Sequence, residues 1–278
     1  MPIIEPHIHM FSRTTDDYQA MYAAGIRACV EPSFWLGSDR RYAGTFFDYF
    51  RLILDFETVR SRRFGVDHYA AVSVNPKEAE DAVLVDEVLA GIGEYLDHPR
   101  CVAVGEIGFN NITDGEERTF CRQLEIARRR EMPVIVHLPH FNKPAGVERT
   151  LKCIRQVGVD ERKIVLDHNA EDCIAASYAS GCWCGFTVYP ISKLTPERVG
   201  RIIRQYGPER MIVNGSADWG ISDPLALVKV VQYLRRDGHD ERTVAKLTFD
   251  NANAFYSQSP RWKPELDLVP PDPRTFQR

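Results

Sequence analysis

Eight short apolar runs, each separated from the next by a longer segment, limit how this chain can fold more than any other feature. Several runs are almost continuously hydrophobic, which is typical of parallel strands covered on both faces. The runs occupy residues 3–9, 26–31, 69–75, 101–105, 134–137, 163–168, 182–188 and 211–214. They therefore predict eight buried strands.

Amphipathic segments with helical spacing lie between many of these runs and after the last one. They cover residues 14–24, 82–96, 116–131, 147–156, 196–206, 224–236 and 243–256. This alternation of strands and helices predicts an α/β fold, the (β/α)8 TIM barrel. An open doubly wound sheet is the alternative. It would normally carry a glycine-rich phosphate turn after its first strand, where this chain has a His-x-His motif.

The length of the chain, 278 residues, suits a single barrel domain, which we expect over residues 1–256. The long segment 32–67, after the second predicted strand, is expected to be an insertion that forms a helix and a lid over the barrel mouth. Five prolines make residues 257–278 a Pro-rich C-terminal tail. We expect this tail to pack as an extended arm if it is ordered.

The composition, with 44% apolar and 27% charged residues, is that of an ordinary globular protein. No run approaches the roughly 20 apolar residues of a membrane span, and no secretory pattern is evident, so we expect a cytoplasmic protein. The formal net charge of −4 disfavours nucleic acid as a partner, although a local basic groove would suffice to bind it. The seven cysteines include Cys182 and Cys184, for which buried reduced thiols are favoured over a metal site.

His7 and His9 stand two residues apart at the end of the first predicted strand. Side chains with this spacing share one face of a strand, so both imidazoles are expected to project together. A pair of neutral imidazoles suits a divalent metal ion. The motif alone fits an exposed or core pair of histidines equally well.

Further residues of the types that bind metals follow the later strands. Glu106 comes after the fourth run, His137 and His168 end the fifth and sixth, and Asp218 follows the eighth. The carboxyl ends of parallel barrel strands meet at one mouth. Together with the first two histidines, these residues predict a metal site at that mouth with positions left for water and substrate.

These motifs resemble those of the TatD-related metal-dependent hydrolases, within the wider amidohydrolase-like barrels. The resemblance extends from residue 3 to about residue 255 and includes V-G-E-I-G around Glu106 and P-V-I-V-H ending at His137. It implies a centre with two divalent ions, one held by His7, His9 and Asp218, the other by His137 and His168, with Glu106 bridging both. Zinc is the first expectation, with manganese, magnesium or iron as alternatives.

The resemblance also implies a mechanism. A hydroxide bridging the two ions would attack the substrate, and Asp218 would act as the general base. We expect the enzyme to cleave an ester, amide, lactone or phosphoester bond of a small molecule. A metal-binding accessory protein of a biosynthetic pathway, without turnover, is an alternative. It would be favoured if that pathway tolerated the loss of Glu106 and Asp218.

The residues that flank the predicted ligands depart from those of the TatD nucleases. Those nucleases usually carry E-T-D-x-P at the last strand, H-x-R after the fifth and H-C-F-S-G after the sixth. This chain reads G-S-A-D-W-G, H-L-P-H and H-N-A-E-D at those places. A TatD-like deoxyribonuclease of the 3'-5' exonuclease type is therefore an alternative, and cleavage of single-stranded DNA with added metal would distinguish it.

Several residues near the predicted mouth are candidates for binding the substrate. Trp35 and Trp219 would wall an apolar pocket, although packing between loops explains them equally well. Lys143 would meet an anionic group and His140 would donate a proton to the leaving group, although solvated loop positions explain both better. The oligomeric state is left open by the sequence.

Overall fold

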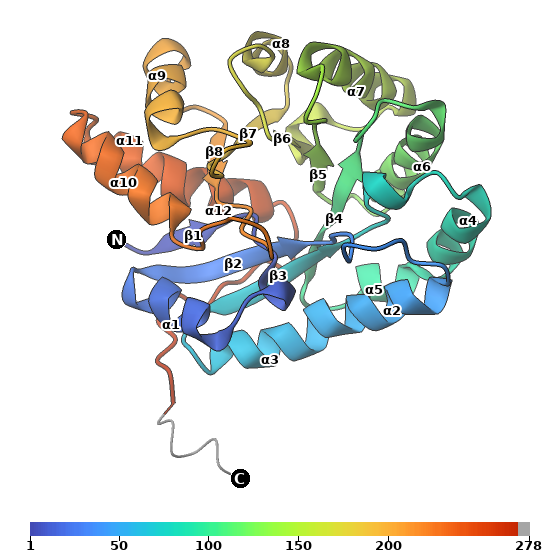
Figure 1. Ribbon diagram of the computed structural model, residues 1–278, viewed down its shortest axis with the longest axis horizontal. Helices are drawn as coiled ribbons and strands as arrows, with labels where there is room; N and C mark the ends of the chain where they lie inside the picture. The colour runs from blue at the N-terminus through green and yellow to red at the C-terminus, as the bar shows by residue number, and fades with distance from the viewer. Residues whose placement is uncertain (272–278) are drawn as a thin grey trace.

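The computed structural model describes residues 1–271, and a ring of eight parallel strands forms its centre (Figure 1). The strands follow one another in sequence order around the ring. They are β1 Ile3–Glu5, β2 Ile26–Pro32, β3 Asp67–Val72, β4 Cys101–Gly108, β5 Val134–His137, β6 Ile164–Asp167, β7 Trp183–Thr187 and β8 Met211–Asn214. The predicted (β/α)8 barrel is confirmed, and the alternative of an open doubly wound sheet is wrong.

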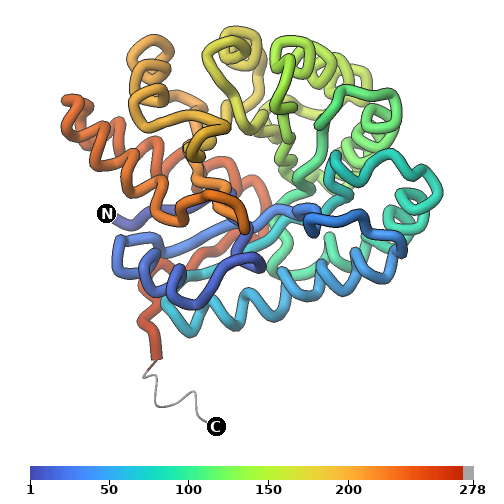
Figure 2. Tube along the Cα trace, viewed as in Figure 1, coloured from blue at the N-terminus to red at the C-terminus, as the bar shows by residue number. Residues whose placement is uncertain are grey.

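The barrel closes through the residues that follow β1 and β8. The Ser216 amide donates to the His7 carbonyl oxygen, and the His9 amide donates to the Ala217 carbonyl oxygen, both at 2.8 Å. The Glu5 carboxylate accepts a further bond from the Gly215 amide at 3.1 Å. The first residues of the chain therefore lie beside its last helices, as the trace in Figure 2 shows.

Helices surround the strands in chain order (Figure 1). They are α1 Thr15–Ala23, α2 Ala43–Arg51, α3 Glu57–Arg62, α4 Ala82–Gly91, α5 Gly93–Leu96, α6 Asp114–Arg129, α7 Lys143–Val157, α8 Ile174–Ala179, α9 Pro196–Tyr206, α10 Ala226–Arg236, α11 Glu241–Ala245 and α12 Asn251–Tyr256. Short helical turns also occur, at η1 Met10–Ser12, η2 Leu52–Phe56, η3 Pro76–Glu78, η4 Glu161–Lys163 and η5 Lys246–Asp250.

Local signals set where the outer helices begin and end. The Thr113 hydroxyl accepts a bond from the Glu116 amide in a capping box at the start of α6. Helix α9 starts with a proline after the capping residue Thr195 and stops at Gly207, so its observed bounds equal the predicted ones. The predicted helix 82–96 is divided into α4 and α5, and helix 243–256 contains the π-helical turn η5.

The first strand is shorter than predicted. We expected residues 3–9, but β1 ends at Glu5 because the next residue, Pro6, has no backbone N–H to donate to a neighbouring strand. His9 has φ −112° and ψ 74°, outside the strand region. The expectation that the two histidines share a strand face is therefore wrong, although their ring centroids lie 4.9 Å apart.

The long segment between β2 and β3 has two parts. Residues 43–62 form α2, η2 and α3, which lie along the outside of the barrel, with α3 against β3 and α2 against α4 (Figure 1). Residues 33–42 form a loop without regular structure. The Phe34 ring in this loop stacks on the His9 ring, with centroids 4.0 Å apart, so the loop covers the histidine pair at the carboxyl end of the strands.

Inward-facing strand residues and the last part of the chain fill the barrel interior. Small side chains such as Ala28 and Ala71 lie in one buried cluster with Phe255, Tyr256 and Trp262. The Tyr256 hydroxyl donates to the Pro6 carbonyl oxygen at 2.7 Å. The segment after α12 therefore contributes to the barrel core, while Pro273 of the predicted tail lies outside the described residues.

A buried ionisable pair lies beneath the first loop. Glu31 on β2 accepts a bond from the Phe11 amide at 2.9 Å and lies 2.8 Å from His68 Nε2. Burial raises the pKa of Glu31 to about 8 and lowers the pKa of His68 to about 4. At neutral pH both groups are therefore mainly uncharged, which suits their fully buried positions.

Within the described residues all seven cysteines are free, and burial raises the pKa of Cys184 to about 12. This thiol therefore stays protonated, as a buried reduced cysteine does. In residues 1–271 no helix has the length and apolar character needed to cross a bilayer.

The packing of Trp262 generates a first prediction. Its buried ring lies 4.7 Å from Tyr69 and 5.2 Å from Tyr256, so Trp262→Ala leaves a cavity at the barrel base. We expect a loss of about 3–5 kcal/mol in the free energy of unfolding, measured by urea denaturation. Val269→Ala, at an exposed tail position, is the control and should cost less than about 0.5 kcal/mol. Equal losses in the two variants would contradict the role of Trp262 in the core.

The Glu31–His68 pair generates a second prediction. A carboxyl whose pKa rises from 4.5 to about 8 on folding makes the folded state bind the extra proton, so stability falls as pH increases between these values. Glu31→Gln keeps an acceptor for Phe11 and a donor for His68 but cannot ionise. Between about pH 6 and about pH 8 we expect the wild type to lose on the order of 2 kcal/mol relative to this variant.

Urea denaturation of both proteins across this pH range measures the difference. Glu125→Gln, at an exposed position on α6, is the matched control and should follow the wild type. A pH dependence that Glu31→Gln leaves unchanged would show that this carboxyl does not titrate on unfolding.

Candidate metal centre

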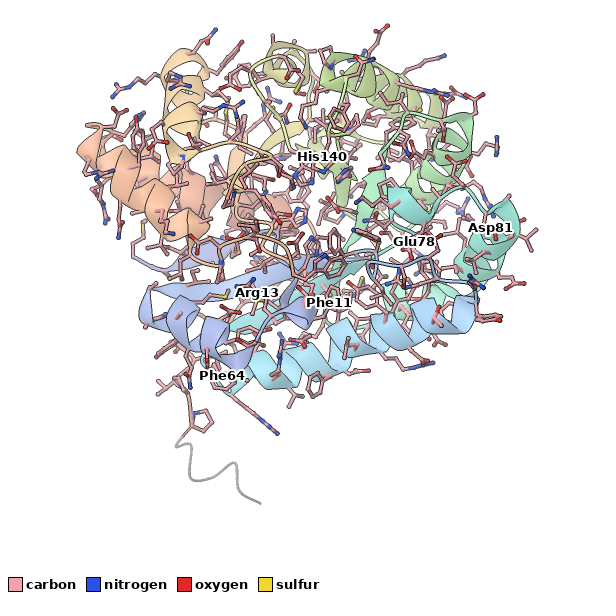
Figure 3. All side chains as sticks on the ribbon, in the orientation of Figure 1. Phe11, Arg13, Phe64, Glu78, Asp81 and His140 are labelled. Atoms are coloured by element: carbon pink, nitrogen blue, oxygen red, sulfur yellow. The ribbon has the colours of Figure 1, made fainter. Side chains whose placement is uncertain are left out.

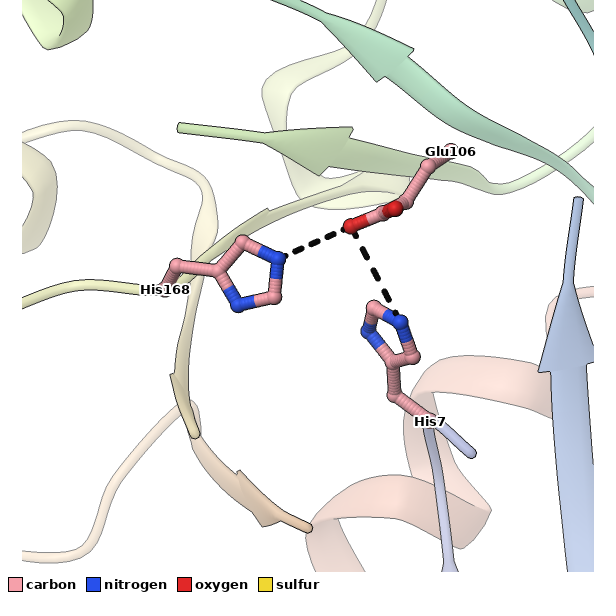
Figure 4. Close-up of side chains that lie close together, drawn as sticks. All are labelled: His7, Glu106 and His168. Carbon is pink, nitrogen blue, oxygen red and sulfur yellow. Dashed lines mark hydrogen bonds and ion pairs between the residues drawn. The ribbon is translucent and has the colours of Figure 1, made fainter. Parts of the chain in front are cut away.

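The Glu106 carboxylate lies at the centre of the site, at the carboxyl end of the barrel. Its Oε1 atom lies 2.8 Å from His168 Nε2, 3.0 Å from His137 Nδ1 and 3.8 Å from His7 Nε2. Figure 4 shows Glu106 between His7 and His168, which reach it from different sides of the barrel. Three predicted ligands, which end or follow β1, β5 and β6, therefore converge on the fourth.

Two glycines allow Glu106 to occupy this position. A Cβ atom at Gly105 would lie 2.7 Å from Ile135 Cβ, and one at Gly108 would lie 2.6 Å from the His137 carbonyl oxygen. Gly108 also has φ +131°, which side-chain-bearing residues rarely adopt. The V-G-E-I-G motif thus lets β4 lie close to β5 and aims Glu106 at His137.

His7 and His9 face each other through their Nε2 atoms at 3.1 Å. His7 Nδ1 lies 2.6 Å from Asp167 Oδ2, an interaction in which Nδ1–H donates and the lone pair of Nε2 stays available. Two nitrogen ligands of one tetrahedral zinc ion, each about 2.0–2.1 Å from it, are about 3.3–3.4 Å apart. The separation of these two nitrogen atoms suits a shared ion.

Asp167 orients His7, and the sequence analysis did not assign it a role. The buried carboxylate also accepts bonds from Asn214 Nδ2 at 3.0 Å and from the His168 amide at 2.7 Å. Burial opposes its ionisation, but the imidazoles of His168 and His7 hold its pKa well below the ordinary range. A carboxylate behind a ligating histidine fixes the ring and its tautomer. Its place immediately before His168, at the end of β6, was the available signal.

The donor atoms fit divalent metal ions. In the described part of the chain, His9 Nδ1 and His137 Nε2 are buried without a hydrogen-bond partner. Burial lowers the pKa of His9 and of His168, so both rings are neutral and can donate a lone pair. Burial also opposes ionisation of Glu106, but His137 and His7 outweigh it and hold the pKa of this carboxyl well below 4.5.

Asp218 lies apart from these ligands. Its Oδ1 atom accepts bonds from the Tyr189 hydroxyl at 2.8 Å and from the Gly220 amide at 2.7 Å. Arg13, labelled in Figure 3, donates to its carbonyl oxygen at 2.9 Å. Asp218 still lines the same cavity as Glu106, which has a volume of about 170 Å³. The structure therefore brings the other five predicted ligands together and leaves the Asp218 carboxylate turned toward Tyr189.

Aromatic residues wall one side of this cavity. Trp35 and Trp219 both line it, with ring centroids 5.5 Å apart. Trp219 also packs against Phe34 and Phe11, so the two tryptophans contact both the cavity and neighbouring loops. Both explanations offered by the sequence therefore apply, because the two rings line the cavity and also pack against neighbouring loops.

The other two predicted substrate residues differ in their positions. His140, labelled in Figure 3, lines the cavity next to His137. Partial burial, together with the basic groups of His137 and Lys193, lowers its pKa to about 3, so its ring is neutral. Lys143 Nζ donates to the carbonyl oxygens of Pro139 at 3.0 Å and His168 at 2.7 Å. Lys143 therefore holds two loops together, and it does not line this cavity.

Two lysines that the sequence analysis missed do line the cavity. Lys77 follows β3 and places its Nζ atom 4.1 Å from the centre of the Trp35 ring. Lys193 follows β7, and its Nζ atom lies 3.2 Å from His168 Nδ1. Burial lowers the pKa of Lys193 to about 8. Both lysines follow strands, β3 and β7, for which no site residue was predicted. Their location after a barrel strand was the only sequence signal that they lie at the mouth.

Comparisons with known proteins agree with this architecture. A family model described as TatD related DNase matches residues 6–257. An uncharacterised metal-dependent hydrolase of Methanocaldococcus jannaschii is 27% identical over 259 residues, which cover 91% of this chain and 99% of the relative. The TatD-like protein of Archaeoglobus fulgidus has a similar structure, with a TM-score of 0.75 and 25% identity over 91% of this chain and 99% of its own.

A more distant structure shares the fold alone. The phosphotriesterase homology protein of Escherichia coli, solved with phosphate in its active site, has a TM-score of 0.67 and 16% identity, over 92% of this chain and 98% of its own. The family assignment rests instead on the model that spans most of the sequence. This chain belongs to the TatD-related DNase family.

Proposed function

We propose that this protein is a metal-dependent hydrolase that cleaves an ester, amide, lactone or phosphoester bond of a small molecule with the help of two divalent ions. The observation that carries the proposal is the convergence on Glu106 of imidazoles from three other parts of the barrel. The metal-dependent hydrolase of Methanocaldococcus jannaschii supports it, because that relative matches 91% of this chain.

The residues divide between two ions in this proposal. His7, His9 and Asp218 would hold one ion, His137 and His168 the other, and Glu106 would contact both. Divalent ions at such a centre supply Lewis acidity and bring the pKa of water toward neutrality. Zinc suits the imidazole donors best, and manganese, magnesium or iron also suit the carboxylates.

The protein's own groups would orient the ligands, exclude water and carry the proton. Asp167 fixes His7 through Nδ1, and Phe34 covers His9 from the solvent side. Asp218 is the proposed general base and would accept the proton on a carboxylate oxygen. The Tyr189 hydroxyl, 2.8 Å from Oδ1, would hold the carboxylate in place.

Metal dependence and the role of Glu106 can be tested together. Elemental analysis of protein purified without added metal, with a screen of ester and phosphoester substrates, should show bound divalent ions and hydrolysis that a chelator abolishes. Glu106→Gln should lower both the metal content and kcat/KM, the latter by at least about 100-fold, because the amide cannot serve as an anionic ligand. Glu125→Gln is the control, and full activity in Glu106→Gln would contradict the proposal.

Asp218→Asn separates ligation from proton transfer. As a general base, Asp218 should contribute about 10²–10⁴-fold to kcat. We expect Asp218→Asn to lose this factor, measured by steady-state kinetics on metal-saturated protein. A variant with unchanged kcat under saturating metal would exclude Asp218 as the base.

Deoxyribonuclease activity is a second candidate, favoured by the family to which the chain belongs. The residues flanking His137, His168 and Asp218 speak against it, because they differ from the nuclease motifs. Incubation of the metal-loaded protein with 3'-labelled single-stranded DNA and manganese, magnesium or zinc decides between the candidates. Release of mononucleotides would establish the nuclease, and intact DNA beside active hydrolysis of small esters would exclude it.

A further inference from the structure

Large apolar side chains are exposed around the open end of the barrel, and bond hydrolysis alone does not require them. Phe141, after β5, is 86% exposed, and Ile191, after β7, is 92% exposed. Trp219 and Ile221, after β8, are exposed as well. All of these residues lie in the loops that follow the strands, at the end of the barrel that carries the metal centre.

Ile191 is the least expected of these residues. Its φ of +70° is in the left-handed region, which is costly for a β-branched residue. Its side chain contributes little to packing because it is almost fully exposed. Neither the backbone nor the core therefore explains an isoleucine here, two residues before Lys193 in the metal cavity.

Phe141 lines a second cavity that continues the first, and Ile191 immediately precedes Ser192, which lines both cavities. An outer cavity of about 750 Å³ is lined by Phe141, Asn110 and Asp39, among others. It shares Trp35, Lys77, His140 and Ser192 with the inner cavity that contains Glu106. A molecule bound at the metal centre can therefore extend outward along Trp35 toward Phe141 and the loop of Ile191.

Lys77 and Lys193 line the inner cavity together with Glu106 and Asp218, but neither lysine forms an ion pair with a carboxylate of the described residues. Within residues 1–271, no carboxylate oxygen lies within 4.0 Å of the Nζ atoms of Lys77 or Lys193. Lysines elsewhere, such as Lys229 with Asp223, form such pairs. Unpaired ammonium groups beside a metal centre favour a negatively charged ligand.

We propose that the substrate is an amphiphilic anion, with an acidic group bound beside Lys77 and Lys193 and an apolar portion lying over Phe141 and Ile191. This inference rests on the proposed function, because it takes the metal cavity as the place of reaction. The substrate's own apolar portion is the favoured occupant of the surface around Phe141 and Ile191, because the outer cavity there continues directly into the inner cavity with its two lysines. A membrane surface, the other possible occupant, is an outcome of the test.

Binding of alkylphosphonates tests the inference without turnover, because their carbon–phosphorus bond replaces the ester bond. Isothermal titration of the metal-loaded protein compares butylphosphonate with octylphosphonate. Four additional methylene groups, even if partly buried, should lower Kd about tenfold or more. Phe141→Ser combined with Ile191→Asn should reduce this gain to about threefold or less. Asn is chosen because it tolerates the left-handed backbone.

Two further variants complete the design. Val83→Ser, at an exposed position on α4 that lines neither cavity, removes an apolar side chain and should keep the full chain-length gain. Lys77→Met should weaken both phosphonates about tenfold while leaving their ratio unchanged, because it removes charge and keeps the apolar stem.

Equal binding of the two phosphonates by the wild type would overturn the inference. A second set of results would also overturn it. The protein would co-sediment with phosphatidylcholine–phosphatidylglycerol vesicles, the Phe141→Ser and Ile191→Asn double variant would not, and phosphonate affinity would not depend on chain length. Phe141 and Ile191 would then contact a membrane. Neither result touches the proposed hydrolase activity, which is measured separately as chelator-sensitive cleavage of the screened substrates.

Discussion

The contact between one buried carboxylate and the imidazoles around it organises the open end of this barrel. Glu106 is almost inaccessible to solvent, and an ionised carboxylate in such a place is costly unless basic or metal partners surround it. His7, His137 and His168 supply those partners from three other parts of the ring. The glycines beside Glu106 and the carboxylate of Asp167 behind His7 serve the same arrangement.

Much of this arrangement could be predicted from the sequence, because it depends on strand order more than on exact strand bounds. Glu106, His137 and His168 follow buried runs, and the carboxyl ends of parallel strands must meet. The prediction for the first strand was wrong because the hydrophobic pattern runs through Pro6, where the hydrogen-bonding ladder stops. The meeting of His7 and His9 depends on the loop and on the seam with β8, which periodicity does not reveal.

Other features of the site arise only from tertiary packing. Lys77 and Lys193 follow barrel strands at positions where a lysine is ordinarily solvated. They line the cavity that contains Glu106 only because the barrel is closed. Lys143 is the opposite case. It follows the predicted ligand His137 in sequence, but its ammonium group donates to two carbonyl oxygens and does not line the cavity. The strand ends thus carry the predicted ligands, while the loops carry the charge and apolar surface that would select a substrate in the proposed function.

The seam between the two ends of the chain has a consequence for biosynthesis. His7 and His9 are synthesised some two hundred residues before Ser216 and Trp262, whose amide and ring complete the wall and the base of the barrel. While the intervening residues are synthesised, the nascent chain therefore carries its histidine pair without this cover, and its apolar strands lack their later neighbours. An ion held by this pair would therefore find a complete site only after the last strands have closed the ring.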